Sequence, residues 1–128
     1  MSISSKTRKQ LWALSGNRCA ICKKLLFQKN EKGESCNVGE ECHIISEKPN
    51  GPRHYSNYGD YDSYENLILL CNEHHKTIDD FSNISTYPPH KLYRIKSEHE
   101  NWVERTLGKR RPTKEETDDI LRKLDLTR

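Results

Sequence analysis

Two short motifs, each with two residues between its potential metal ligands, constrain this chain more than any other feature. Cys19 and Cys22 lie in the run NRCAIC, and Cys71 and His74 lie in the run LLCNEHH. Two intervening residues let one tight turn present both side chains to a single tetrahedral Zn2+. We therefore predict a structural zinc site that joins two distant segments.

The second motif contains two adjacent histidines, and only one is needed to complete a four-ligand site. The two-residue spacing from Cys71 favours His74, which leaves His75 free for another role. If His75 completed the zinc site instead, that role would be lost.

Composition indicates a small domain that gains from a bound metal. The chain has 128 residues, of which 32% are hydrophobic, so few apolar side chains are available for a core. It has five cysteines and an N-terminal run without an apolar stretch, which favours a reducing cytoplasm and metal binding over disulfides. No stretch approaches the roughly 20 apolar residues that cross a bilayer, so we expect no membrane association.

Charge gives only a mild bias toward polyanionic partners, because 22 basic residues face 19 acidic ones for a net charge of +3. A solvated surface of mixed sign explains this balance equally well. The basic residues nevertheless cluster locally, at Lys6, Arg8 and Lys9, at Lys23 and Lys24, and at Lys109, Arg110 and Arg111.

Hydrophobic periodicity and turn residues predict a mixture of helices and short strands. Helices are expected at 6–15, about 74–81 and about 91–107, and strands at 42–45 and 67–70. Polar or turn-rich sequence predicts loops at 28–39 and 47–59. We expect one domain over residues 1–108, then a linker and a short helix over 109–128, capped by Thr113 with Glu116 three positions on.

The order of motifs over roughly residues 8–107 resembles the HNH endonuclease family. The matching runs are NRCAIC, ECHIIS, GPRHY, YENLILLCNEHHKTID and HKLYRIKSEHENWV. The resemblance implies an α+β fold: a small zinc-stapled ββα-metal domain with flanking helices. The local sequence of these runs is most similar to that of HNH domains fused to sensor modules in bacterial anti-phage defence effectors of the HNH-SAVED type.

The resemblance also implies site residues. His43 matches the histidine that takes a proton from the attacking water, and Asn66 matches the asparagine that braces the loop carrying this base. His75 matches a ligand of the catalytic divalent ion. Asp79 follows four residues later, on the same face of a helix, and with His75 would hold Mg2+ or Mn2+, or Ni2+.

Each residue also has an ordinary structural interpretation. His43 could fill a strand position or supply zinc, Asn66 could be a turn or cap residue, and Asp79 could simply face solvent. One position departs from the commonest family pattern: Cys42 precedes the base where many relatives have a metal-binding Asp or His. A soft thiolate is a poor Mg2+ ligand, so we expect Cys42 to be buried filler. Cys36 has no assigned role.

Candidate DNA contacts are Arg53 and His54 in the loop GPRH, together with Lys23 and Lys24. A guanidinium matches phosphate oxygens in a bidentate manner, although an arginine in such a loop is often only solvated. No base-reading element is visible in the sequence, so we expect weak sequence preference.

The sequence therefore predicts a metal-dependent endonuclease that acts on double-stranded DNA, with structural Zn2+ and a second, working ion. Because uncontrolled cleavage would harm the host, we expect control by a sensor domain, a partner protein or a homodimer. Two alternatives remain: a zinc-stapled nucleic-acid-binding module without catalysis, and a zinc-ribbon module that contacts only protein.

Overall fold

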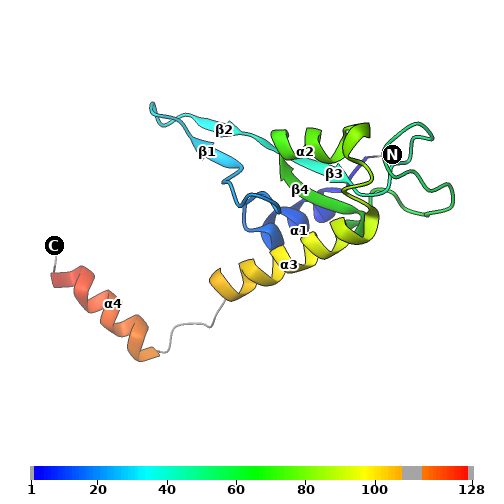
Figure 1. Ribbon diagram of the computed structural model, residues 1–128. Coiled ribbons are helices and arrows are strands. Elements are labelled where there is room, and N and C mark those ends of the chain that lie inside the picture. The colour runs from blue at the N-terminus through cyan, green and yellow to red at the C-terminus, as the bar shows by residue number, and fades with distance from the viewer. Residues whose placement is uncertain (1, 108–113, 127–128) are drawn as a thin grey trace.

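The computed structural model describes residues 2–107 and 114–126. Its centre is a ββα element: strand β3 (Gly39–His43), strand β4 (Leu67–Cys71) and helix α2 (Asn72–Asp79). The two strands are antiparallel, and their register pairs Gly39 with Cys71 and His43 with Leu67. The predicted α+β fold is confirmed (Figure 1).

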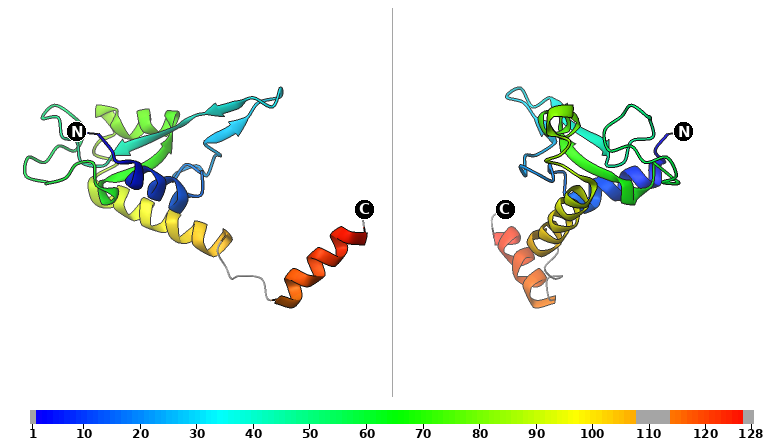
Figure 2. Two further views of the ribbon diagram at one scale, coloured as in Figure 1. Left: turned by 180° about the vertical axis from the view of Figure 1, so that it is seen from behind. Right: turned by 45° about the vertical axis from the view of Figure 1, so that its right-hand side comes forward.

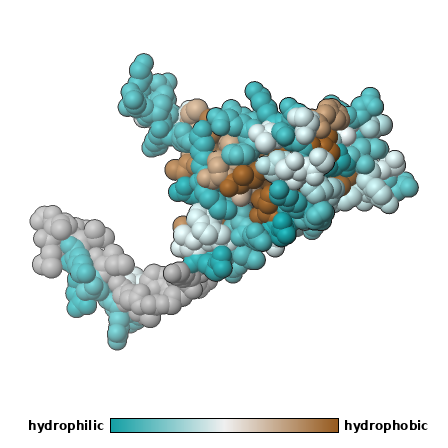
Figure 3. Space-filling model, viewed as in Figure 1, coloured by the Kyte–Doolittle hydropathy of each residue, from teal (hydrophilic) through white to brown (hydrophobic). Residues whose placement is uncertain are grey.

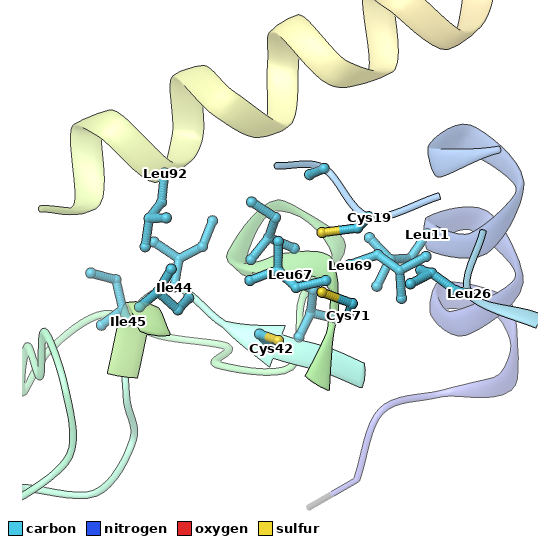
Figure 4. Packing of buried hydrophobic residues seen from close by; sticks show 14 residues of the cluster. Leu11, Cys19, Leu26, Cys42, Ile44, Ile45, Leu67, Leu69, Cys71 and Leu92 are labelled. Carbon is cyan, nitrogen blue, oxygen red and sulfur yellow. The ribbon is translucent and has the colours of Figure 1, made fainter. Parts of the chain in front are cut away.

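Strand β4 is the middle layer of the domain. All five of its residues are buried, because α2 contacts the strand and helix α1 (Ser5–Ser15) also contacts it. Helix α3 (Pro89–Leu107) packs against α1. Figure 4 shows Leu92 of α3 and Leu11 of α1 approaching a common core with Ile44, Leu67 and Leu69.

Local signals explain where α1 begins and ends. Ser4 caps its first turn by accepting a hydrogen bond of 3.1 Å from the Thr7 backbone N–H. Gly16 ends it with a φ of 61° in the left-handed region. A Cβ atom at Gly16 would lie 2.9 Å from a Val103 methyl group, so glycine also permits the close approach of α3.

The prediction of a loop over residues 28–39 is wrong. Strands β1 (Phe27–Lys29) and β2 (Ser35–Asn37) form a separate antiparallel hairpin there. No residue of either strand is buried, so the alternation of apolar and polar residues that marks a half-buried strand is missing from the sequence. Figures 1 and 2 show the hairpin extending from the domain, and Figure 3 shows a largely hydrophilic surface along it.

The long connection between β3 and β4 has no regular structure until the 3-10 helix η1 (Tyr64–Asn66). Helix α3 fixes the end of this connection through Lys96, whose Nζ atom donates 2.9 Å to the Tyr64 carbonyl and lies 3.5 Å from the centre of the Tyr64 ring. The Tyr64 hydroxyl donates to Glu100. These contacts join α3 to the residues directly before Asn66.

The remaining elements are the 3-10 helix η2 (Phe81–Asn83) and helix α4 (Lys114–Leu126), which stands apart from the other elements in Figure 2. The predicted cap at Thr113 lies outside the described residues. In the part of the chain that the structure describes, no helix has both the length and the apolar character of a membrane span.

Candidate active site

The four predicted zinc ligands meet at one point. Cys19 and Cys22 come from the turn after α1, whereas Cys71 ends β4 and His74 lies in the first turn of α2. Their ligand atoms all lie within 4.8 Å of one another. The two distant motifs therefore meet as predicted, in one Cys/His cluster that could hold a metal ion.

The spacing within this cluster fits a tetrahedral ion. The Sγ atoms of Cys22 and Cys71 are 3.9 Å apart, and Cys19 Sγ is 3.9 Å from His74 Nδ1. Ligands about 2.3 Å from a tetrahedral zinc ion are separated by about 3.8 Å. A disulfide requires a sulfur separation of only about 2.05 Å. The donor set of three sulfurs and one imidazole also suits Zn2+.

The two thiols of the first motif differ in how readily they ionise. Burial alone would raise the pKa of Cys19, but backbone N–H groups of Cys22, Cys71 and Ile21 together lower it. Burial, reinforced by the neighbouring Cys19 sulfur, raises the pKa of Cys22 to about 11. Cys19 therefore loses its proton more readily than Cys22, and a positive ion beside the cluster would favour the thiolate form of both.

His75 lies outside the Cys/His cluster, as predicted. Its Nε2 atom is 3.0 Å from Oδ2 of Asp79, one helical turn on, and its Nδ1 atom is 3.2 Å from Oε2 of Glu40 on β3. The hydrogen bond with Asp79 raises the pKa of His75, although burial opposes it. Burial also acts against ionisation of Asp79, but His75 and Arg53 outweigh it and lower the pKa of that carboxyl.

These side chains can hold a divalent cation in one specific manner. Nε2 of His75 and the Asp79 carboxylate face each other from adjacent turns of α2, and an imidazole and a carboxylate suit Mn2+, Mg2+ or Ni2+. Glu40 meets the opposite ring nitrogen, where a carboxylate fixes the tautomer of a metal-bound histidine. Metal binding at Nε2 requires that nitrogen to be unprotonated, so an ion would compete there with a proton.

Arg53 does not have the exposure expected of a phosphate clamp. Only 1% of its side chain is exposed, and it donates 2.7 Å hydrogen bonds to the carbonyls of Ile44 and Ile78. Its Nη2 atom also donates to Oδ1 of Asp79 at 2.7 Å and to the His43 carbonyl at 3.4 Å. Arg53 therefore connects the end of β3 to the end of α2 within the domain.

His43 is the last residue of β3, and 39% of its side chain is exposed. Its Nε2 atom lies 2.8 Å from Oδ1 of Asp62 in the connection before η1. Strand alternation gives His43 the parity of Glu41, which contacts α1, rather than that of Glu40, which contacts α2. Among the described contacts, His43 reaches Asp79 only through Arg53.

Asn66 is fully buried and braces the segment that follows His43, as predicted. Its Oδ1 accepts from the Ile45 N–H at 2.8 Å, and its Nδ2 donates to the Ile45 carbonyl at 3.0 Å. Nδ2 also donates to the Tyr61 carbonyl at 2.8 Å. One side chain thus fixes the backbone beside both His43 and Asp62.

The remaining cysteines behave differently from the cluster. Cys42 is 1% exposed, and burial raises the pKa of its thiol well above the usual value, so the prediction that it is buried filler is confirmed. Cys36 is exposed on β2 and lies outside the metal cluster.

The candidate DNA contacts differ in their availability. Lys24 is exposed, whereas the Lys23 ammonium lies 2.7 Å from His99 Nδ1 and 4.9 Å from the centre of the Trp102 ring. His54 is half-buried, with Nδ1 2.8 Å from the Ser46 carbonyl oxygen. The geometry therefore leaves Lys24 free and engages Lys23 and His54 within the domain.

Sequence analysis missed two acidic residues of the site, Glu40 and Asp62. Glu40 could have been found from the register, because it lies two residues before Cys42 and shares its strand face. No local signal marks Asp62, because an irregular connection of some twenty residues brings it to His43.

A Cys/His cluster joins the turn after α1 to the end of β4 and the start of α2. Together with a histidine at the end of β3 and another on α2, it is the arrangement of a ββα-metal domain. The family model described as HNH endonuclease matches residues 19–83, which include both metal motifs, His43 and Asp79. The match covers half of the chain, and the chain belongs to the HNH endonuclease family. A comparison with curated proteins gave no match.

Proposed function

We propose that this chain is a metal-dependent endonuclease domain that hydrolyses phosphodiester bonds of double-stranded DNA with little sequence preference. The observation that carries the proposal is that two adjacent histidines belong to two different sites. His74 belongs to the zinc-type cluster, while His75 faces Asp79 outside it. A purely structural zinc module has no need for this second pair.

We assign the chemistry to three groups. The imidazole of His43 takes the proton from water while the water oxygen bonds to phosphorus and the bond to the 3′ oxygen breaks. The leaving oxygen then takes a proton from solvent. His75 and Asp79 hold Mg2+, Mn2+ or Ni2+, which supplies positive charge for the transition state when bound. Asn66 keeps the backbone after His43 in place.

Exposed cationic side chains would bind the phosphate backbone. Lys24 remains the best placed of the predicted contacts, and the exposed residues Lys6, Arg8 and Lys9 of α1 could add to it. Contacts of this kind position DNA without reading bases and weaken steeply with salt. The proposal therefore requires binding that falls as the salt concentration rises.

We further propose that residues 1–108 form the nuclease domain, and that residues 109–128 connect it to a sensor or partner that controls cleavage. The resemblance to defence effectors supports a role against phage in the bacterial cytoplasm. Pairing two copies would place two active sites on opposite strands, so a homodimer is the proposed form for double-strand cutting.

Plasmid cleavage in Mg2+, Mn2+ or Ni2+ tests the activity. The wild-type protein should nick supercoiled DNA, and His43→Ala should reduce the rate by about 10²- to 10⁴-fold, the usual contribution of a general base. His90→Ala is the matched control because His90 is exposed at the start of α3. Equal rates for His43→Ala and the wild type would contradict the assignment.

A binding module without catalysis is the second candidate. It is favoured by the buried Cys42 in place of a hard metal ligand and by the separation of His43 from His75. This candidate predicts salt-sensitive DNA binding by the wild-type protein with no cleavage in any of the three ions. Zinc content measured by mass spectrometry would show that each tested protein is correctly folded.

A further inference from the structure

We infer that Asp62 is a positioning residue for His43: its carboxylate accepts the Nε2 proton of the imidazole and so leaves Nδ1 as the atom that takes the proton from water. The inference rests on the proposed function and adds to it the residue that orients the base. Asp62 lies in the irregular connection, nineteen positions after His43.

The contact is short and sheltered on the aspartate side. Nε2 of His43 lies 2.8 Å from Oδ1 of Asp62, and the two side chains are 39% and 16% exposed. A carboxylate accepts hydrogen bonds but cannot donate them. A neutral imidazole carries one proton, so a proton held at Nε2 leaves a lone pair at Nδ1.

The connection is built to hold Asp62 in this place. Its backbone N–H donates 3.0 Å to Oδ1 of Asp60, and the preceding carbonyl, that of Tyr61, accepts from Asn66. The Tyr61 hydroxyl donates 2.7 Å to the Tyr55 carbonyl. These backbone and side-chain bonds fix the chain at Asp62 and directly before it.

The same asparagine fixes the histidine. Asn66 holds both backbone groups of Ile45, two residues after His43, and its own carbonyl accepts from Ile44 at 2.8 Å. Acid and imidazole are thus placed by one buried side chain, so their contact does not depend on the exposed surface of the loop.

The carboxylate also matters during the reaction. When Nδ1 takes a proton from water, the ring becomes an imidazolium, and the hydrogen bond from Nε2 to the Asp62 carboxylate becomes an ion pair with charge on both partners. The oxygen of the same water bonds to phosphorus, and the bond to the 3′ oxygen breaks. Asp62 remains an acceptor throughout and stabilises the positive ring.

The tautomer of His43 is measured directly by nitrogen-15 NMR of the zinc-loaded protein, at a pH where the ring is neutral. We expect the wild type to carry the proton at Nε2, and Asp62→Ala to show a mixture of both tautomers. Asp62→Glu, which can still accept, should keep Nε2 protonated. A wild-type proton at Nδ1, or an unchanged tautomer in Asp62→Ala, overturns the inference.

Cleavage kinetics provide the second measurement. Asp62→Ala should lower kcat by about 10- to 100-fold, less than loss of the base itself, with KM near the wild-type value. Glu65→Gln is the matched control, since Glu65 is an exposed acid of the same segment. A kcat equal to that of Glu65→Gln overturns the inference alone. An inactive wild type contradicts the proposed function, and the tautomer still decides the role of Asp62.

Discussion

Arg53 and Asp79 form an ion pair in which Nη2 lies 2.7 Å from Oδ1, with the arginine side chain 1% exposed and the aspartate side chain 30% exposed. The pair closes the ββα element, because the same guanidinium holds carbonyls of both β3 and α2. A residue expected to contact DNA thus joins two parts of the candidate active site.

Removing this guanidinium should destabilise the domain strongly. Arg53→Met leaves the Ile44 and Ile78 carbonyls and the Asp79 carboxylate without their donor, and loss of one partner of a buried pair costs about 3 kcal/mol. Urea unfolding of the zinc-loaded protein measures the change. Arg8→Met is the control, because Arg8 pairs with Glu41 at an exposed surface. If both variants lose a similar free energy of unfolding, the contacts of Arg53 stabilise the domain no more than an exposed ion pair does.

Zinc binding should depend on Cys22 but not on Cys36, although both cysteines are exposed. Cys22→Ser removes one of four ligands and should lower the zinc content and the melting temperature, because metal binding contributes directly to folding. Cys36→Ser should retain one zinc per chain, since Cys36 lies outside the cluster. Native mass spectrometry and thermal unfolding measure both effects. Loss of zinc from Cys36→Ser would contradict the assigned ligand set.

The working ion should depend on Glu40 as well as on α2. His75→Ala should abolish measurable Mn2+ binding in calorimetry of the zinc-loaded protein, whereas Glu40→Gln should weaken it about 10- to 100-fold, the usual effect of losing an orienting carboxylate. Glu73→Gln is the matched control for a change of charge on the exposed side of α2. If Glu40→Gln binds Mn2+ as the control does, Glu40 does not orient His75.

Stability should fall in mild acid because of His99. Burial lowers the pKa of this 1%-exposed histidine, and its Nε2 atom lies 2.9 Å from the Ser15 carbonyl oxygen. The unfolded chain, with a pKa near 6.5, therefore binds the proton more readily. The contribution of neutral His99 to the free energy of unfolding is therefore complete above pH 6.5. It decreases as the pH falls through that value.

A comparison of wild type and His99→Gln isolates this effect. Between pH 7.5 and 5.5, the free energy of unfolding should drop more for the wild type than for His99→Gln, with both proteins saturated with zinc. Loss of zinc ligands to protons affects both proteins alike, so the difference reports on His99. If the free energies of unfolding of the two proteins fall equally with pH, protonation of His99 does not cause the loss of stability.

The Cys/His cluster and the ββα element were predictable because their signals are local. Two-residue ligand spacing and a continuous apolar run identify Cys71 and β4 without any knowledge of the partner segments. The choice of His74 over His75 followed from the same spacing and is confirmed. Motif order then gave Asn66, whose bracing contacts agree with the prediction.

The contacts that depend on the loop path could not be predicted. Arg53 has a φ of 57° in the left-handed region, which turns the chain there and directs the guanidinium inward. Nothing in a Gly-Pro-Arg run distinguishes this outcome from a solvated side chain. The contact of Asp62 with His43 likewise depends on the path of an irregular loop. The exposed hairpin of β1 and β2 could not be predicted because it lacks the alternation of apolar and polar residues that indicates a strand.

The hydrogen bond from Lys96 to Tyr64 couples the position of α3 to the loop before Asn66. This helix of 19 residues is about 28 Å long, and near its middle Lys96 holds the backbone two residues before Asn66. A rotation of α3 about its axis would therefore move the Tyr64 backbone and, through it, the segment that Asn66 holds beside His43. Helix α3, which leads to the C-terminal residues, is therefore linked through Tyr64 and Asn66 to the segment beside His43.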